Sequence, residues 1–318
     1  MKIAVISDVH GNFPALKAVV DDAQKNNCEK FIFLGDYVFD LPFSIDVTKL
    51  LMDMPNSHLI KGNKEVFLSK LAEENQKNWI NRQMAAAYYT FNELYKEPEL
   101  FSFLTNLDDI AEIELDYGNK IYASHTFNIH SHMKKSKATS ATFHYETLKN
   151  PSYPNYYEKA FSEMVNTNEF KSCINHINAN IILFGHTHLQ SHAYCGEKLI
   201  INPGSCGQPL DFNINAPYTI LEINKGSINV IEKRVEYDVL NAIEKTKQSV
   251  FYKEGQTWTD LVCIALKTGK DYFGIFFNIA EEIALSKNEG GRKSGEYFSN
   301  ATWESAKEIF FEKYSERY

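Results

Sequence analysis

The sequence predicts an α/β fold, because a buried strand, a helix and a second buried strand follow one another at its start. Residues 3–6 form an apolar run of the length of a strand buried on both faces. Asn12 can cap the helix that follows, and Pro14 suits its first turn. Residues 30–34 form the second apolar run, and a strand–helix–strand unit of this spacing is typical of a right-handed parallel crossover.

Further apolar runs and helical patterns continue the alternation along the chain. Runs of strand length occur at residues 58–61, 109–115, 120–124, 180–184, 191–194, 198–201, 218–223 and 228–233. Helical spacing occurs at residues 45–52, 65–107 and 156–177. Asn78 could cap a helix within the second of these segments. From about residue 236 the pattern is helical only, so we expect a first domain at 1–235, with a helical insertion at about 65–107, and a helical C-terminal extension at 236–318.

The composition excludes several classes of protein. The chain has 318 residues, enough to bury a substantial core, and its 44% hydrophobic and 23% charged residues are ordinary for a globular protein. A net charge of -8 without a basic tract argues against nonspecific binding of long nucleic acid. The five cysteines are scattered, which favours a reduced, cytoplasmic protein over a disulfide framework or a zinc ribbon. We expect no signal peptide and no membrane-spanning segment.

Seven side chains with nitrogen or oxygen donors follow apolar strands and lie on no helical stripe. They are Asp8, His10, Asp36, Asn63, His125, His186 and His188. Since α/β proteins bind ligands at the carboxyl ends of their strands, we expect these donors to converge. The set is too large for one tetrahedral zinc and suits two five- or six-coordinate ions that share a bridging carboxylate. Two such ions, about 3.5–4 Å apart, could clamp a phosphate and deprotonate the water between them.

The order of these motifs resembles that of the calcineurin-like metallophosphoesterase superfamily: Asp8-x-His10, Gly35-Asp36, Gly62-Asn63, His125 and Gly185-His186-Thr187-His188. The block Asn-Pro-Gly-Ser-Cys-Gly-Gln-Pro at 202–209 is similar to its compact microbial branch, which includes small phosphodiesterases and some diadenosine polyphosphate hydrolases. The resemblance covers residues 1 to about 233. It implies two mixed β-sheets packed face to face as a sandwich, with helices outside.

The resemblance also assigns the seven donors to two divalent ions: Asp8, His10 and His188 to the first, Asn63, His125 and His186 to the second, and Asp36 as the bridge between them. Nitrogen and oxygen donors without sulfur tolerate several divalent metals, so availability decides among them. On this basis we expect manganese, with iron, zinc, nickel or magnesium as alternatives.

Two positions depart from the family pattern. Lys64 stands where many relatives have a histidine that is credited with protonating the leaving oxygen, and Thr126 follows His125 where glycine is usual. Lys64 could bind a phosphate or donate a proton, and we favour the charge-binding role because an amine is a poor acid near neutral pH. Asn12, Lys64 and Thr126 are the expected substrate contacts, with Asn12 a helix cap first. Asp40 could support the Asp36 loop, although we expect it to be a surface carboxylate.

Six further histidines lie outside the motif series. An isolated histidine is more often structural than a ligand, and this is the role expected for His58, His144, His176 and His192. His130 and His132 follow His125 closely in a polar stretch, so a functional role stays open for them.

These observations predict a metal-dependent phosphoesterase in which a hydroxide that bridges two ions attacks phosphorus. Asp36, Asn63, Lys64 and His125 would take catalytic roles. Small phosphodiesters or dinucleoside polyphosphates are favoured as substrates, partly by the family branch and partly by the charge of Lys64. The alternatives are an inactive scaffold for protein interaction, a phosphomonoesterase or protein phosphatase, and a nuclease on long chains, which the acidic balance disfavours. The aromatic helices of the extension could form a lid or a contact between identical subunits.

Overall fold

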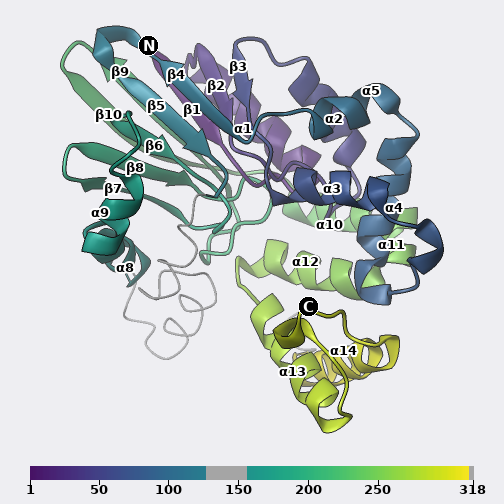
Figure 1. Cartoon of the computed structure of the whole chain (residues 1–318). Coiled ribbons are helices and arrows are strands. Elements are labelled where there is room, and N and C mark those ends of the chain that lie inside the picture. The colour runs from purple at the N-terminus through teal and green to yellow at the C-terminus, as the bar shows by residue number, and fades with distance from the viewer. Residues whose placement is uncertain (127–155, 315–318) are drawn as a thin grey trace.

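The computed structural model describes residues 1–126 and 156–314, and two mixed five-stranded β-sheets packed as a sandwich form its centre (Figure 1). This confirms the predicted fold class. The first sheet contains, in spatial order, β10 (Ser227–Val235), β9 (Ala216–Asn224), β1 (Lys2–Ile6), β2 (Lys30–Phe33) and β3 (Ser57–Leu59). The second contains β4 (Ile110–Glu114), β5 (Lys120–Ser124), β6 (Ile181–Leu183), β8 (Lys198–Pro203) and β7 (Gln190–Cys195).

Both sheets contain parallel strands, and the direction of these strands decides where the polar loops meet. β1, β2 and β3 run parallel to one another, and β9 pairs antiparallel with β1. In the second sheet β5, β6 and β8 run parallel, while β4 and β7 form antiparallel edges. The loops that follow β1 and β2 therefore lie at one edge of the first sheet, and those that follow β5 and β6 lie at one edge of the second.

The alternation of side chains along β1 shows why this strand is apolar throughout. Ile3 and Val5 pack between the sheets with residues of both, including Leu183 and Leu221. The intervening Ala4 and Ile6 face the helices outside, and all four side chains are fully buried. A strand covered on both faces needs apolar residues at every position.

Helices cover the outer faces of both sheets. Over the first sheet these are α1 (Phe13–Lys25), α2 (Ser44–Met52), α3 (Asn63–Glu73), α4 (Ala85–Tyr95) and α5 (Pro98–Thr105). Over the second they are α8 (Tyr156–Val165) and α9 (Asn168–Ile174), which pack on side chains of β6 and β8. As predicted, Asn12 caps α1, since its side-chain oxygen accepts a hydrogen bond from the backbone N–H of Ala15 at 3.2 Å.

The helical insertion differs from the prediction in its details. Asn78 is no helix cap; it ends a short 3₁₀ turn, Gln76–Asn78, that Asn75 caps. The first α-helix after this turn begins only at Ala85. The cause is a second short turn, Arg82–Met84, which Asn81 caps in the same way. Two closely spaced asparagines thus hold the backbone in turns where helical spacing alone predicts continuous helix.

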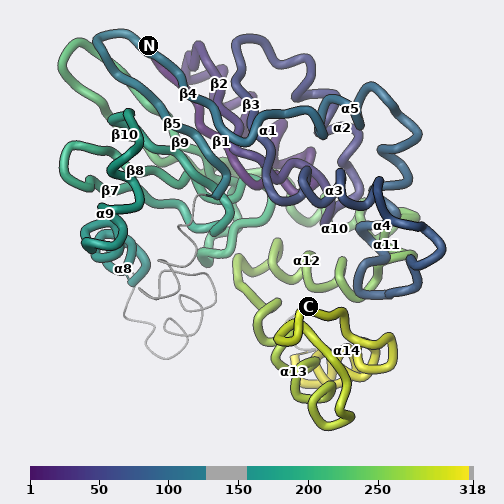
Figure 2. The backbone as a smooth tube through the Cα atoms, in the orientation of Figure 1, coloured from purple at the N-terminus to yellow at the C-terminus, as the bar shows by residue number. Residues whose placement is uncertain are grey.

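The C-terminal extension consists of α10 (Val239–Gln248), α11 (Val250–Glu254), α12 (Gln256–Thr268), α13 (Phe273–Ser286) and α14 (Asn300–Tyr314). α11 and α12 pack against α4 of the insertion, whereas α13 and α14 pair with each other beyond them (Figure 2). The large aromatic residues expected to need burial, Tyr272, Phe276, Trp303 and Phe310, are at most 1% exposed in a shared cluster. Burial within the chain therefore accounts for them, and contact with a second copy stays a prediction.

None of the helices in the described segments combines the length and the apolar character that a membrane crossing needs.

Candidate metal centre

Backbone hydrogen bonds join, in two pairs, four of the loops that carry the predicted donors. The N–H groups of Asp8 and His10 donate to the carbonyls of Gly35 and Asp36 at 3.0 and 2.9 Å, which joins the loops after β1 and β2. The N–H of Gly185 donates to the carbonyl of His125 at 3.1 Å, which joins the loops after β5 and β6. The side chains therefore rest on a rigid frame.

Five of the seven donors have a backbone conformation that non-glycine residues rarely adopt. Their φ angles are positive, at 54° for Asp8, 51° for His10, 57° for Asp36, 69° for His186 and 60° for His188. Such a conformation costs on the order of 1–3 kcal/mol per residue and persists only where the surroundings impose it. Its concentration in these loops is typical of a functional site.

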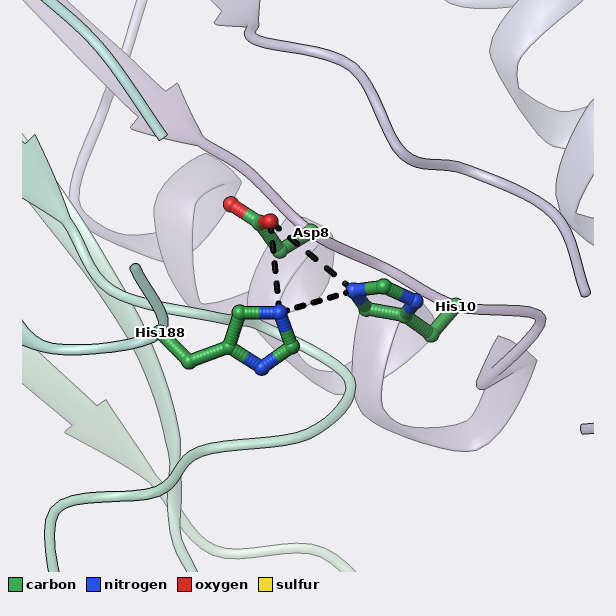
Figure 3. A group of neighbouring side chains, drawn as sticks. All are labelled: Asp8, His10 and His188. Carbon is green, nitrogen blue, oxygen red and sulfur yellow. Dashed lines mark hydrogen bonds and ion pairs between the residues drawn. The ribbon is translucent and has the colours of Figure 1, made fainter. Parts of the chain in front are cut away.

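The first group of donors comprises Asp8, His10 and His188 (Figure 3). The Nε2 atoms of His10 and His188 lie 3.0 Å apart. They lie 3.8 and 3.5 Å, respectively, from Oδ1 of Asp8. Three donor atoms from two loops thus face one point.

Hydrogen bonds on the far side of three imidazole rings determine which nitrogen faces this centre. Nδ1 of His188 lies 2.7 Å from the carbonyl oxygen of Gln208, and Nδ1 of His125 lies 2.6 Å from that of Leu34. A carbonyl oxygen can only accept, so each Nδ1 carries the proton and Nε2 is the atom available to a cation. Nδ1 of His10 donates in the same way to the Asp40 carboxylate at 2.6 Å.

The second group comprises Asp36, His125 and His186, and the side chain of Asn63 joins it. Oδ1 of Asn63 lies 3.0 Å from Nε2 of His125 and 2.9 Å from Nδ1 of His186. Asp36 lies between the two groups: its Oδ1 is 3.4 Å from Nε2 of His125, and its Oδ2 is 4.0 Å from Nε2 of His10. The two oxygens of one buried carboxylate therefore face different groups.

The pKa values show how strongly the carboxylates and imidazoles of the site are coupled. Burial alone would raise the pKa of Asp8, but its hydrogen bond with His10 and the nearby His125 and His188 lower it to about 2. Burial alone would lower the pKa of His10, but hydrogen bonds with Asp40 and Asp8 raise it to about 9. The pKa of His125 rises to about 10, against the effect of burial, because of the Asp36 charge. The carboxylates are ionised at neutral pH and hold positive charge between them.

Asp40 is a buried junction, which corrects the expectation of a surface carboxylate. It is 4% exposed, and its Oδ2 accepts from Nδ1 of His10 at 2.6 Å and from Nζ of Lys64 at 2.8 Å. Its Oδ1 accepts from the indole N–H of Trp258 at 2.8 Å. Three donors oppose one negative charge, and the pKa of Asp40 is well below its ordinary value although burial acts in the opposite direction. Asp40 therefore orients His10 toward the first group.

Lys64 is paired and charged. Burial would lower the pKa of its ammonium group, but Asp40 and Asp36 raise it above the ordinary value. The neighbouring Glu65 was not predicted as part of the site, yet its buried carboxylate accepts from three backbone N–H groups, those of Asp36, Tyr37 and Gly62, at 2.8–2.9 Å. Glu65 thus fixes the Asp36 loop against the start of α3.

Asn12, one of the expected substrate contacts, makes several hydrogen bonds within the fold. Its side chain is fully buried, and its amide N–H₂ donates to the carbonyl of Gly207 and the hydroxyl of Tyr237 at 2.8 and 3.1 Å. These bonds and the helix cap engage both polar atoms of its side chain, and a contact with substrate stays a prediction. Thr126 is exposed beside His125 after β5. His130, His132 and His144 lie outside the described residues, and His192 forms a surface pair with Glu232 at 2.8 Å.

A cavity of about 500 Å³ opens onto the centre, a size ordinary for small-molecule sites. Five of the seven donors line this cavity together with Asp40 and Lys64: His10, Asp36, Asn63, His186 and His188. The opposite wall comes from the C-terminal extension, with Trp258, Phe273, Phe277 and Arg292 among its residues. The donor set contains only nitrogen and oxygen atoms, and the Nδ1 protons of His10, His125 and His188 are already hydrogen-bonded on the far side of each ring. The set therefore fits hard or borderline divalent cations.

Comparisons with known proteins agree with this geometry. The model of the calcineurin-like phosphoesterase family matches residues 1–190. An uncharacterized protein of Methanocaldococcus jannaschii, MJ0912, is 29% identical over 258 residues, which cover 76% of this chain and 90% of that protein.

Two solved structures are similar in fold. A metallophosphoesterase from Sphaerobacter thermophilus aligns with a TM-score of 0.57 at 20% identity, over 85% of this chain and 99% of that one. A hypothetical protein from Pyrococcus horikoshii OT3, PH1004, aligns with a TM-score of 0.56 at 16% identity, over 82% and 97%. The family model spans more than half of the sequence and includes all seven donors, whereas β8, β9 and β10 lie beyond it. The chain belongs to the calcineurin-like phosphoesterase family.

Proposed function

We propose that this protein is a phosphodiesterase that uses two divalent metal ions to hydrolyse small phosphodiesters or dinucleoside polyphosphates. The family implies a metal-dependent phosphoester hydrolase. The observation that carries the finer proposal is the position of Asp36, whose two carboxylate oxygens face His125 and His10 in different donor groups. A single carboxylate placed in this way suits a bridge between two cations.

The residues that would hold the two ions follow from the two groups. Asp8, His10 and His188 would bind one ion, and Asn63, His125 and His186 the other, with Asp36 shared. When bound, such ions supply a water that is activated at neutral pH and positive charge for the oxygens of a phosphate. Manganese remains our first choice of metal, because the donor set contains no sulfur.

The protein's own side chains would orient and neutralise the substrate. Lys64, charged and at the cavity wall, would bind a phosphate oxygen through Nζ. Its pairing with Asp40 stabilises the charged form, which supports electrostatic binding over proton donation. Leaving groups that need no strong acid, such as acidic phenols or phosphates, suit this arrangement better than alkyl alcohols. Thr126, exposed beside His125, would flank the substrate.

The alternative of an inactive scaffold for protein interaction rests on loss of metal ligands, and here every donor of the motif series is retained. A phosphomonoesterase would use the same centre with a different preference among substrates. A substrate panel therefore separates these readings.

The experiment combines metal analysis with turnover. The purified protein should bind about two divalent ions per chain, hydrolyse bis(4-nitrophenyl) phosphate with added Mn²⁺, and lose this activity on chelation. Asp36→Asn should abolish turnover, because a neutral amide bridges two cations poorly, while the exposed Asp116→Asn serves as the matched control. Metal at background level together with activity that survives chelation would remove the proposal. A clear preference for 4-nitrophenyl phosphate over the diester would favour the monoesterase.

A further inference from the structure

A second cavity, of about 470 Å³, adjoins the cavity of the metal centre. The side chains that line both are Asp40, Asn63, Lys64, Trp258, Phe277 and Arg292. These shared residues form the boundary between the two cavities, and Asn63 among them is itself a metal donor. A substituent on a phosphate at the metal centre could therefore extend into the second cavity across Lys64.

Apolar and aromatic side chains form most of the second cavity, and Lys70 and Gln83 add polar groups to its wall. Phe39 and Phe67, whose ring centres are 5.7 Å apart, form one side. Met84 and Ala87 come from the insertion. Phe277 and Tyr297 come from the extension and close the other side. Two segments outside the sandwich thus combine to make one pocket, of a size and lining typical of sites that bind a ring.

Two positively charged side chains lie over aromatic rings at the boundary between the two cavities. Nζ of Lys64 lies 6.0 Å from the centre of the Trp258 ring, and the guanidinium carbon of Arg292 lies 4.0 Å from the centre of the Phe277 ring. The flat guanidinium offers a stacking surface as well as charge. A ligand that joins a negative group to an aromatic ring matches both the charge and the stacking surface of this boundary.

We propose that the second cavity is a subsite for an aromatic group carried by the substrate close to its phosphate. The substrate class is then a phosphoester in which a ring is connected to phosphorus through a short linker. Phe277, on α13, and Ala87, on α4, are the specificity-determining positions, since they line the cavity from the extension and from the insertion. This inference rests on the proposed function, because it assumes that a phosphate occupies the metal centre.

Binding of two phosphonates that are not hydrolysed tests the subsite. Isothermal titration calorimetry of the full-length protein loaded with Mn²⁺ would compare benzylphosphonate with methylphosphonate, which differ only by the ring. Burial of the ring should make the benzyl compound bind about tenfold or more tightly. The ratio of the two Kd values should fall to within about twofold of unity in Phe277→Ala, which opens the wall, and in Ala87→Trp, which fills the cavity.

Leu285→Ala is the matched control, because Leu285 is also on α13 but is 63% exposed and lines neither cavity. It should keep the wild-type ratio. Equal Kd values in the wild-type protein, or a ratio that Phe277→Ala leaves unchanged, would overturn the proposal; if that variant does not fold, Ala87→Trp decides in the same way. A benzyl preference without hydrolysis of any phosphoester would refute the proposed function alone, whereas hydrolysis without the preference would refute the subsite alone.

Discussion

Replacement of Asp40 by asparagine should weaken both the fold and the first metal site. The variant Asp40→Asn keeps the shape but removes the charge that three donors share at 2.6–2.8 Å. The single oxygen of an amide can face either Trp258 or the pair of His10 and Lys64, and its N–H₂ then opposes the donors on the other side. The Lys64 side chain is only 22% exposed and would keep only the more distant charge of Asp36, so loss of its paired carboxylate should cost about 3 kcal/mol in the free energy of unfolding. In a chain of this size that corresponds to a fall in Tm of roughly 5 °C.

The effect on metal binding has a different origin. Without the carboxylate, His10 loses the partner that fixes its Nδ1 proton, so affinity for the first ion should fall by about 10–100-fold. Differential scanning calorimetry of the chelated protein measures the first effect, and calorimetric titration with Mn²⁺ measures the second. The exposed pair of Asp109 with Lys61 provides the control, because Asp109→Asn removes a surface contact that is worth at most about 1 kcal/mol.

A double variant separates the two effects. Adding Lys64→Met to Asp40→Asn removes the unpaired ammonium, so Tm should recover in part while the metal affinity stays low. If Asp40→Asn unfolds at the wild-type temperature, or if the double variant restores metal binding, then Asp40 is not the junction described here.

Three further predictions follow from the site. Lys64→Ala should lower kcat/KM by a similar factor for a 4-nitrophenyl and an alkyl ester, and a much larger loss on the alkyl ester would show that Lys64 donates a proton. The pKa of His10 is raised from 6.5 to about 9 in the metal-free protein, so a cation must displace its proton below that pH. The affinity for Mn²⁺, measured by titration, should therefore rise about tenfold per pH unit between pH 6.5 and 9. An affinity that does not change with pH would contradict this prediction. Truncation after Arg234 should leave the metal ligands in place but expose apolar surface and change the substrate range; a truncated protein with unchanged solubility, assembly and substrate profile would make the extension an accessory packing element.

The strand loops could be predicted from the sequence because their signals are local. Asp8 and His10 directly follow an apolar run, and His186 and His188 do the same after another, so position along the chain already places them at the end of a strand. The two sheets and the helical extension followed from the same patterns and from the resemblance to the family.

The role of Asp40 could not be predicted, because its burial depends on distant residues. Trp258 lies 218 positions away, and no periodicity connects the two. One local signal was available: Asp40 follows Tyr37, Val38 and Phe39, an apolar run that a surface loop seldom contains. Asn12 shows the converse, since a polar residue beside the site proved to be fully occupied by the helix cap, Gly207 and Tyr237. Whether a polar side chain is free depends on its neighbours in space.

The hydrogen bond between Trp258 and Asp40 also has a consequence for the order in which the molecule is made. During synthesis from the N-terminus, both sheets can be complete once residue 235 has been added, but the indole that holds Asp40 arrives only afterwards. We therefore expect the nascent sandwich to fold before the ring of His10 is fully oriented. The cavity acquires its second wall, and the enzyme its complete binding surface, only when the last quarter of the chain has folded onto the insertion.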